Sequence, residues 1–267
     1  MSRELRRLLV APERLAAMPA GDGSGGLLDL EPEEAHYLER VLRYRPGERL
    51  AVVDGCGRLW TAVLEPQGRL RLEQPPQTPR IRQEAPWPPL LLAMAVPKRE
   101  ADLVWRMATE LGADRLQPLL ASRGAPGERC PLPRWEGIVR EATEQCERLW
   151  RPSLMAPQPA EAWLGRPFQG IALLATTRRE GLPLCGGVLG ELVDREREAA
   201  LRGGLHLAIG PEGGWSPQEE QAAEAAGWRP VSLGESILRT ATAAVSGLAL
   251  LAHWRALSCA SCRQPSP

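Results

Sequence analysis

The chain has 267 residues, 43% of them hydrophobic and 25% charged, and its formal net charge is zero. This length can hold one large domain or two modest ones, with the composition of an ordinary globular protein. The zero net charge removes any global electrostatic argument for nucleic-acid binding, and no apolar run approaches the roughly 18 residues of a membrane span. Residues 1–18 mix acidic and basic side chains without a long apolar core, so they do not predict a signal peptide. We expect a cytoplasmic protein with no membrane partner.

The N-terminal part of the chain predicts a small β-barrel. Within residues 31–50 the pattern is that of a helix that begins near Pro32 and ends in a Pro46-Gly47 turn. Three short β-like segments follow, with Asp54-Gly55 as a turn signal between the first two. These segments occupy residues 49–54, 58–64 and 68–73. We assign residues 1–75 to this barrel domain.

A second, larger domain follows a proline-rich linker at residues 76–89. Strands and helices then alternate, which is typical of a parallel sheet with helices on both faces. The predicted strands occupy residues 89–96, 114–122, 170–177, 205–210 and 230–234. The predicted helices occupy residues 98–112, 134–150, 216–227 and 240–257. We expect this α/β domain to span residues 90–258 and a polar tail to occupy residues 259–267.

The cysteines do not predict a metal site. Of the six, only Cys259 and Cys262 form a C-x-x-C pair, and no second pair completes a zinc site. Both lie in the polar tail, so we expect no bound metal and reduced thiols.

Residues 209–221, IGPEGGWSPQEEQ, lead from a strand through a glycine-rich loop into a helix. Glycine lets the backbone approach a ligand closely, and Ser216 and Glu219 form a capping box around a proline at the first helical position. The loop lacks the spacing of phosphate-binding loops, and Glu212 would repel a phosphate. A purine ligand that carries positive charge, such as S-adenosylmethionine, suits it better. The loop alone leaves a tight turn with a satisfied glutamate equally open.

Residues 233–244, LGESILRTATAA, repeat the same order of strand, loop and helix. The carboxyl ends of parallel strands meet at one edge of a sheet, where ligands are commonly bound. The two loops together therefore predict one ligand held at that edge.

These two segments resemble the signature motifs of the ribosomal RNA small subunit methyltransferase E family, which methylates N3 of a uridine in 16S ribosomal RNA. The resemblance continues in order through HYLERVLRYRPGERLAVVDGCG, KREADLVWRMATELGADRLQPLLASR and REATEQCERLWRP, and so covers nearly the whole chain. It implies a PUA-like N-terminal barrel and a C-terminal SPOUT domain with a deep trefoil knot, a rare exception to unknotted topology. It also implies a homodimer, S-adenosylmethionine as the cofactor, and 16S ribosomal RNA in an assembled or nearly assembled small subunit as the substrate.

The resemblance places the cofactor against three loops at strand ends. The residues it assigns to cofactor binding are Leu174, Ala175, Thr176, Ile209, Gly210, Pro211, Glu212, Gly213, Gly214, Leu233, Gly234, Ile237, Leu238, Arg239 and Thr240.

Methylation of uracil N3 requires loss of the N3 proton, so a base or a group that stabilises the uracil anion is needed. Arg239 is the first candidate for anion stabilisation, although a helix-capping or interface ion pair explains it equally well. Glu212 can accept the proton or fix the loop, and we favour the loop role. One departure stands out, because Ala241 replaces a glutamate that the family usually carries.

The predicted RNA contacts are arginines, whose forked guanidinium suits phosphate. They are Arg40, Arg43, Arg123 and Arg148, with a solvated helix face or structural ion pairs as the competing explanations. Two other functions stay open: a related SPOUT enzyme that modifies a ribose 2′-hydroxyl or another base, and an RNA-binding protein whose catalysis is weakened by Ala241.

Overall fold

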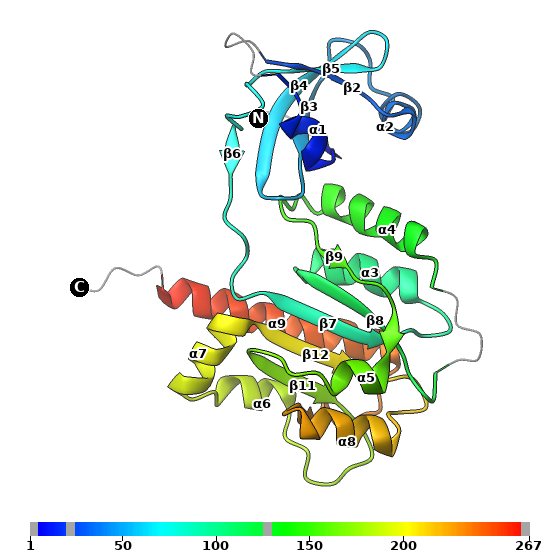
Figure 1. Ribbon diagram of the computed structural model, residues 1–267, viewed down its shortest axis with the longest axis vertical. Helices are drawn as coiled ribbons and strands as arrows, with labels where there is room; N and C mark the ends of the chain where they lie inside the picture. The colour runs from blue at the N-terminus through cyan, green and yellow to red at the C-terminus, as the bar shows by residue number, and fades with distance from the viewer. Residues whose placement is uncertain (1–4, 20–24, 125–129, 263–267) are drawn as a thin grey trace. The chain divides into compact units, whose positions relative to one another are not determined.

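The computed structural model describes residues 5–19, 25–124 and 130–262, with side chains described as far as residue 258. The chain forms two compact units, each with its own sheet (Figure 1). The first unit comprises Met1–Ala85 and Arg140–Arg151, and the second comprises Pro86–Val139 and Pro152–Pro267. The first unit therefore takes in residues 140–151, which the sequence places in the α/β domain.

The first unit is built on a mixed sheet in the order β1-β3-β4-β5-β2, with β6 paired to β4. Strand β1 runs parallel to β3 and the other pairs are antiparallel. The strands are β1 (Arg7–Leu9), β2 (Leu27–Asp29), β3 (Arg49–Val53), β4 (Arg58–Glu65), β5 (Arg69–Leu72) and β6 (Ile81–Arg82), and the short helices are α1 (Pro12–Ala16) and α2 (Pro32–His36). Strand β6 lies inside the predicted linker. Leu50, Trp60 and Leu70 are fully buried at the centre of this unit.

The helix predicted between Pro32 and the Pro46-Gly47 turn ends at Leu42 and is not α-helical throughout. After α2 the chain makes one π-helical turn, η1 (Tyr37–Val41), and Leu42 is the last residue with helical backbone. Arg43 then adopts φ of 57°, in the left-handed region that ends many helices. The turn predicted at Pro46 is therefore reached by an extended segment and not by a continuing helix.

Buried charges attach the end of helix α4 (Leu132–Gln145) to the first unit. The Arg140 guanidinium lies 3.2 Å from an oxygen of the buried Glu34 carboxylate and donates to the Leu9 carbonyl at 2.7 Å. The Leu9 amide in turn donates to Glu144 Oε1 at 2.7 Å. Burial outweighs the favourable effects of the Leu9 amide and of the Arg140 guanidinium, 3.7 Å from Glu144 Oε1, and raises the pKa of Glu144 to about 7. These contacts explain why residues 140–151 belong to the barrel unit.

We expect the raised pKa of Glu144 to make the protein less stable as pH rises. Below about pH 4.5 the Glu144 carboxyl is protonated in both the folded and the unfolded protein. Between about pH 4.5 and 7 it loses its proton in the unfolded chain but keeps it in the folded protein. The free energy of unfolding therefore falls by about 3 kcal/mol over this pH range, at 1.36 kcal/mol per pKa unit. Glu144→Gln should therefore raise the melting temperature at pH 8 and change it little at pH 5. In thermal unfolding, the exposed neighbour Glu141→Gln serves as control. If Glu144→Gln changed the melting temperature equally at pH 5 and pH 8, the raised pKa of Glu144 would be contradicted.

The second unit contains a wholly parallel sheet in the order β10-β8-β7-β12-β11-β13, with β9 paired to β8. Its strands are β7 (Leu90–Ala95), β8 (Arg115–Leu120), β9 (Ser153–Leu154), β10 (Gln158–Pro159), β11 (Ile171–Ala175), β12 (Leu205–Ile209) and β13 (Arg229–Val231). Besides α4, its helices are α3 (Ala101–Glu110), α5 (Ala160–Leu164), α6 (Cys185–Gly190), α7 (Asp194–Gly203), α8 (Pro217–Ala225) and α9 (Thr240–Cys262). The predicted α/β fold with a parallel sheet is confirmed, and the trefoil knot stays a prediction.

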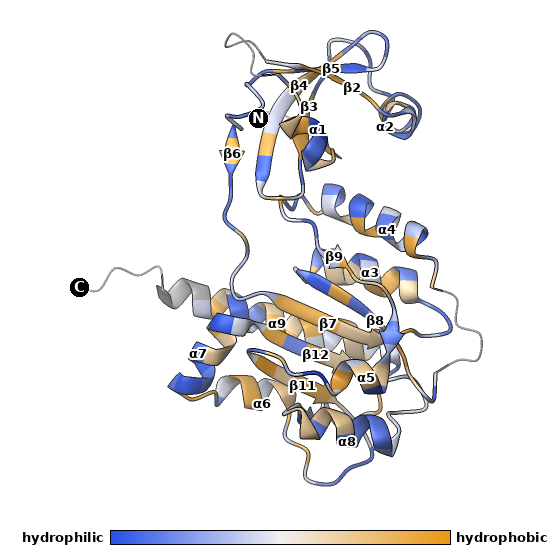
Figure 2. Cartoon of the chain, in the orientation of Figure 1, coloured by the Kyte–Doolittle hydropathy of each residue, from blue (hydrophilic) through white to orange (hydrophobic). Residues whose placement is uncertain are grey.

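Helices cover both faces of this sheet, as the strand sequences require. Along β7, Leu90, Leu92 and Met94 pack on one side against α3 and α9, while Leu91 and Ala93 pack on the other, where α5 and α8 lie. Because successive strand side chains alternate between faces, a strand buried on both sides needs a continuous apolar run. Figure 2 shows these hydrophobic colours along β7, β11 and β12.

Several boundaries in the second unit differ from the predicted ones. Helix α4 ends at Gln145, shortly before Glu147, whose φ of 61° interrupts helical geometry. The backbone of α9 continues to Cys262, into the predicted tail. The side chains of Cys259 and Cys262 and all of residues 263–267 lie outside the described residues. Among the described helices, none is both long and apolar enough to cross a membrane.

Candidate functional site

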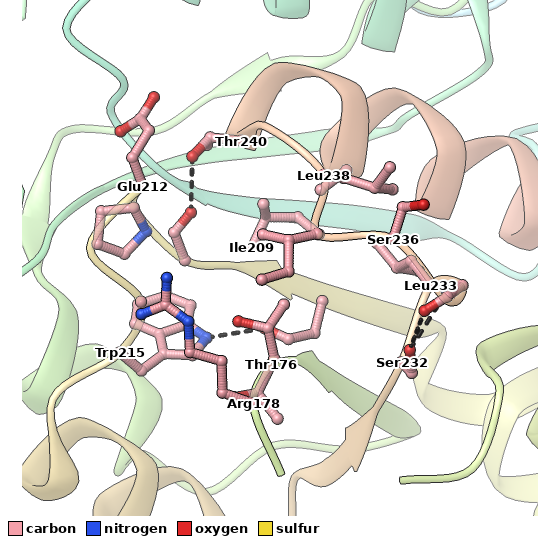
Figure 3. A pocket seen from close by; sticks show the side chains of 18 residues that line it. Thr176, Arg178, Ile209, Glu212, Trp215, Ser232, Leu233, Ser236, Leu238 and Thr240 are labelled. Carbon is pink, nitrogen blue, oxygen red and sulfur yellow. Dashed lines mark hydrogen bonds between the residues drawn. The ribbon is translucent and has the colours of Figure 1, made fainter. Parts of the chain in front are cut away.

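A pocket lies where β11, β12 and β13 end, at the carboxyl edge of the parallel sheet (Figure 3). Three segments that are distant in sequence line the pocket, each following one strand. The lining residues are Ala175, Thr176, Thr177, Arg178, Ile209, Gly210, Pro211, Glu212, Gly214, Trp215, Ser232, Leu233, Gly234, Ser236, Ile237, Leu238, Thr240 and Ala243.

The structure brings together most of the residues that the sequence assigns to the cofactor. All of them line the pocket except Leu174, Gly213 and Arg239. Leu174 is fully buried in β11 and packs in the core on the side of α5 and α8. Arg239 is exposed at the start of α9, between two residues that do line the pocket. The cofactor roles of all these residues stay predictions.

Trp215 explains why position 210 is a glycine. The Trp215 indole N–H donates to the Ala175 carbonyl at 3.0 Å and so joins the loops after β11 and β12. A Cβ on Gly210 would lie 3.1 Å from the Trp215 ring, which is tighter than ordinary contact. Thr240 adds a second bond, because its hydroxyl donates to the Gly210 carbonyl at 3.0 Å. The loop after β12 is therefore held by α9 and by its own tryptophan.

The predicted capping box at the start of α8 is present and has a further partner. One Glu219 carboxylate oxygen accepts from the Ser216 amide at 2.7 Å, and the Glu219 amide donates to the Ser216 hydroxyl at 3.2 Å. The other oxygen accepts from the Ser122 amide at 2.7 Å, and the side chain is fully buried. The positive end of α8 is thus already occupied by a carboxylate of the chain itself, so it does not offer a phosphate site.

The charged groups around the pocket are few. Glu212 and Arg178 are the only ionisable residues among those that line it. Both are exposed, and neither has a hydrogen bond or ion pair with another described residue. The structure therefore gives no contact by which Glu212 would fix the loop, which was the favoured interpretation of its role. A mostly apolar pocket with one free carboxylate and one free guanidinium suits a ligand with an aromatic ring system and a charged end.

The arginines predicted to contact RNA occupy different environments. Arg40 and Arg43 are exposed in the first unit and have no partner among the described residues. Arg148 is half-buried in the segment after α4. In the second unit, Arg123 donates to the Trp215 carbonyl at 3.0 Å, so it braces the loop after β12. Contact of these four residues with RNA stays a prediction.

Sequence reasoning did not select several residues that line the pocket. These are Thr177, Arg178, Trp215, Ser232, Ser236 and Ala243. Three of them stand inside the two recognised motifs and Ser232 directly precedes the second, so the motif positions themselves could have indicated Trp215, Ser232, Ser236 and Ala243. The segment after β11 has no comparable motif.

Comparison with known proteins gives the same class for both units. A family described as the RNA methyltransferase domain matches residues 83–252, and one described as the RNA methyltransferase PUA domain matches residues 30–73. A curated ribosomal RNA small subunit methyltransferase E from Synechocystis is 38% identical over 250 residues, which are 91% of this chain and 76% of the relative.

Two solved structures share the fold over nearly their full length. A ribosomal RNA small subunit methyltransferase E from Neisseria gonorrhoeae, bound to S-adenosylmethionine, is 27% identical with a TM-score of 0.71 and covers 92% of this chain and 96% of that chain. A methyltransferase from Legionella pneumophila, in complex with the same cofactor, is 25% identical with a TM-score of 0.71 and covers 93% and 97% of the two chains.

The sheet, its edge pocket and the PUA domain define an RNA methyltransferase. Within that class, the chain belongs to the ribosomal RNA small subunit methyltransferase E family. The predictions of the family, of an RNA methyltransferase and of S-adenosylmethionine as its cofactor are confirmed.

Proposed function

We propose that this chain transfers a methyl group from S-adenosylmethionine to N3 of a uridine in 16S ribosomal RNA, acting in the cytoplasm on an assembled or nearly assembled small subunit. The observation that carries the proposal is the pocket at the ends of β11, β12 and β13, two of whose three lining segments resemble the family motifs. The ribosomal substrate rests on the names of the relatives, and the uridine N3 position rests on the resemblance of the motifs.

The chemistry assigns separate roles to two residues. Uracil N3 lies on the base-pairing edge, so the uridine must be unpaired or turned out before it can react. The methyl group then passes directly from sulfur to N3, which makes alignment of the three atoms a major part of the rate. Glu212, free and on the pocket wall, accepts the N3 proton, and Arg239 stabilises the negative charge that develops on the uracil oxygens.

Mapping the product in ribosomal RNA tests this proposal. Small subunits from a strain that lacks the gene are incubated with the purified chain and the cofactor. We expect one new N3-methyluridine in 16S RNA, seen by mass spectrometry of nucleosides and as a stop of reverse transcriptase, because the methyl group blocks base pairing. A 2′-O-methylated ribose or another methylated base as the product would contradict methylation at uridine N3 and indicate a related enzyme of different specificity. Cofactor binding without any methylated product would indicate the RNA-binding protein with weakened catalysis.

Arg40 and Arg43 should contribute to RNA affinity through phosphate contacts. Each arginine that neutralises a phosphate adds about one unit to the slope of log affinity against log salt. Arg40→Ala and Arg43→Ala should each weaken RNA binding and reduce that slope by about one unit. Binding measured over a series of salt concentrations checks this. Arg202→Ala, which removes an exposed arginine paired with Glu198, is the control and should leave the slope unchanged. An unaltered slope in the two test variants would contradict phosphate contact.

We also propose that the chain acts as a homodimer, with α9 in the interface. Leu248 and Leu251 of α9 are fully buried, whereas Leu250 and Leu257, seven residues apart on one face, are 38% and 57% exposed. Sedimentation should find a dimer at micromolar concentration, and Leu250→Asp with Leu257→Asp should shift it to monomer. Leu103→Asp, equally exposed on α3, should leave the dimer intact. A wild-type monomer that still methylates RNA would contradict the dimer.

A further inference from the structure

Arg178 has an unusual environment for an exposed arginine. It follows the end of β11 by three residues and lines the pocket. Its φ of 61° is in the left-handed region, which side chains with a Cβ rarely adopt and which recurs at functional sites. Figure 3 shows its side chain among the residues that surround the pocket, and no described residue forms a hydrogen bond or ion pair with it. The guanidinium therefore lies at the pocket with its donors free.

The next residue provides a contrast within the same loop. Arg179 forms an ion pair with Glu224 of α8 and does not line the pocket. Two adjacent arginines thus have different surroundings, one paired on the surface and one unpaired at the pocket. A structural need for positive charge in this loop is met by Arg179 and does not explain Arg178.

The rest of the lining indicates which part of a ligand reaches Arg178. Apart from Glu212, the pocket is lined by neutral groups, including the apolar side chains of Ile209, Leu233 and Leu238. S-adenosylmethionine carries an adenosine, with its flat adenine ring, at one end and an amino acid, with one carboxylate, at the other. The forked guanidinium forms paired hydrogen bonds with a carboxylate, and these are stronger than neutral ones.

We propose that Arg178 binds the carboxylate of the methionine part of the cofactor, a contact that rests on the proposed binding of S-adenosylmethionine in this pocket. Arg178 is then a specificity-determining residue, because it distinguishes the complete cofactor from adenosine compounds that lack the amino acid. The contact forms without RNA, so it is measured in the free protein.

Calorimetry with two ligands tests the contact. S-adenosylhomocysteine carries the carboxylate, whereas 5′-methylthioadenosine has the same adenosine and sulfur but no amino acid. Arg178→Gln should weaken S-adenosylhomocysteine binding by about tenfold, as expected for one exposed charge-assisted contact, and leave 5′-methylthioadenosine binding unchanged. Arg178→Lys should keep part of the affinity. Arg179→Gln, the matched control, should change neither ligand. Higher salt should reduce the difference in S-adenosylhomocysteine affinity between the wild type and Arg178→Gln, because salt screens the charge interaction.

Other results would overturn the proposal. Unchanged S-adenosylhomocysteine affinity in Arg178→Gln would exclude the carboxylate contact, and a loss of both ligands with an unchanged melting temperature would indicate a general distortion of the pocket. If Arg178→Gln weakened only RNA binding, with a smaller salt dependence, the partner of Arg178 would be an RNA phosphate. A wild-type protein that bound neither ligand would contradict the proposed function itself.

Discussion

Glu212→Gln should lower the rate of methyl transfer by about 10² to 10⁴, the usual contribution of a positioned general base. Glutamine keeps the shape of the side chain but cannot take a proton from uracil N3. Glu212 is the only carboxylate among the lining residues, and it has no partner within the described part of the chain. Thr240 and Trp215 hold the loop, so the substitution should leave the loop folded. Glu212 also lines the pocket, so cofactor affinity is measured separately from the rate.

Single-turnover methylation of small subunits over a range of pH values measures this effect. Uracil loses its N3 proton more readily as pH rises. The difference in methylation rate between the wild type and Glu212→Gln should therefore become smaller at alkaline pH. Glu235→Gln is the matched control, because Glu235 lies in the neighbouring loop without lining the pocket. If Glu212→Gln weakened cofactor binding by the same factor as turnover, Glu212 would hold the ligand or the loop and the proton acceptor would be another group.

The site was predictable where a strand, a glycine loop and a helix follow one another directly. Residues 205–221 and 230–244 each contain all three, so the amino-acid pattern alone places the ends of two strands at one sheet edge. The buried runs of β7 and β12 and the capping box of Ser216 and Glu219 are equally local signals.

Contacts between distant segments were not predictable in this way. The sequence shows Arg178 and Arg179 side by side, and only the fold brings Glu224 to one of them. The bond from Trp215 to the Ala175 carbonyl likewise joins two loops that are 40 residues apart. Leu174 was assigned to cofactor binding by the resemblance, and its burial in β11 depends on core packing that the motifs do not show.

The barrel unit was the least predictable part of the fold. Strands β1 and β2 have three residues each and β6 has two. Segments this short do not show a recognisable alternation of apolar and polar residues. Arg43 and Glu147 end helices in a left-handed conformation without the glycine that usually marks such a position. The attachment of residues 140–151 includes the contact between Glu34 and Arg140, more than a hundred residues apart, which no local pattern indicates.

Arg239→Ala should lower turnover by about a hundredfold or more while nearly preserving the affinities for RNA and cofactor. Arg239 is exposed between Leu238 and Thr240, both of which line the pocket, and it has no partner among the described residues. This position at the rim leaves its guanidinium free for the substrate base. A cation beside a uracil oxygen stabilises the anion that forms as the N3 proton leaves, and a loss of a hundredfold corresponds to about 2.7 kcal/mol of transition-state stabilisation.

The readouts for Arg239 differ from those for the other two arginine groups. Arg178→Gln should change cofactor affinity, Arg40→Ala and Arg43→Ala should change the salt dependence of RNA binding, and Arg239→Ala should change only the rate of the bound complex. Arg239→Lys, which keeps the charge, should recover part of that rate. Measurements on intact small subunits as well as free RNA are needed, because the uridine is proposed to be presented in the assembled subunit. If Arg239→Ala and Arg40→Ala lost RNA affinity equally and kept the same rate once bound, Arg239 would be an RNA-binding residue and the uracil anion would be stabilised elsewhere.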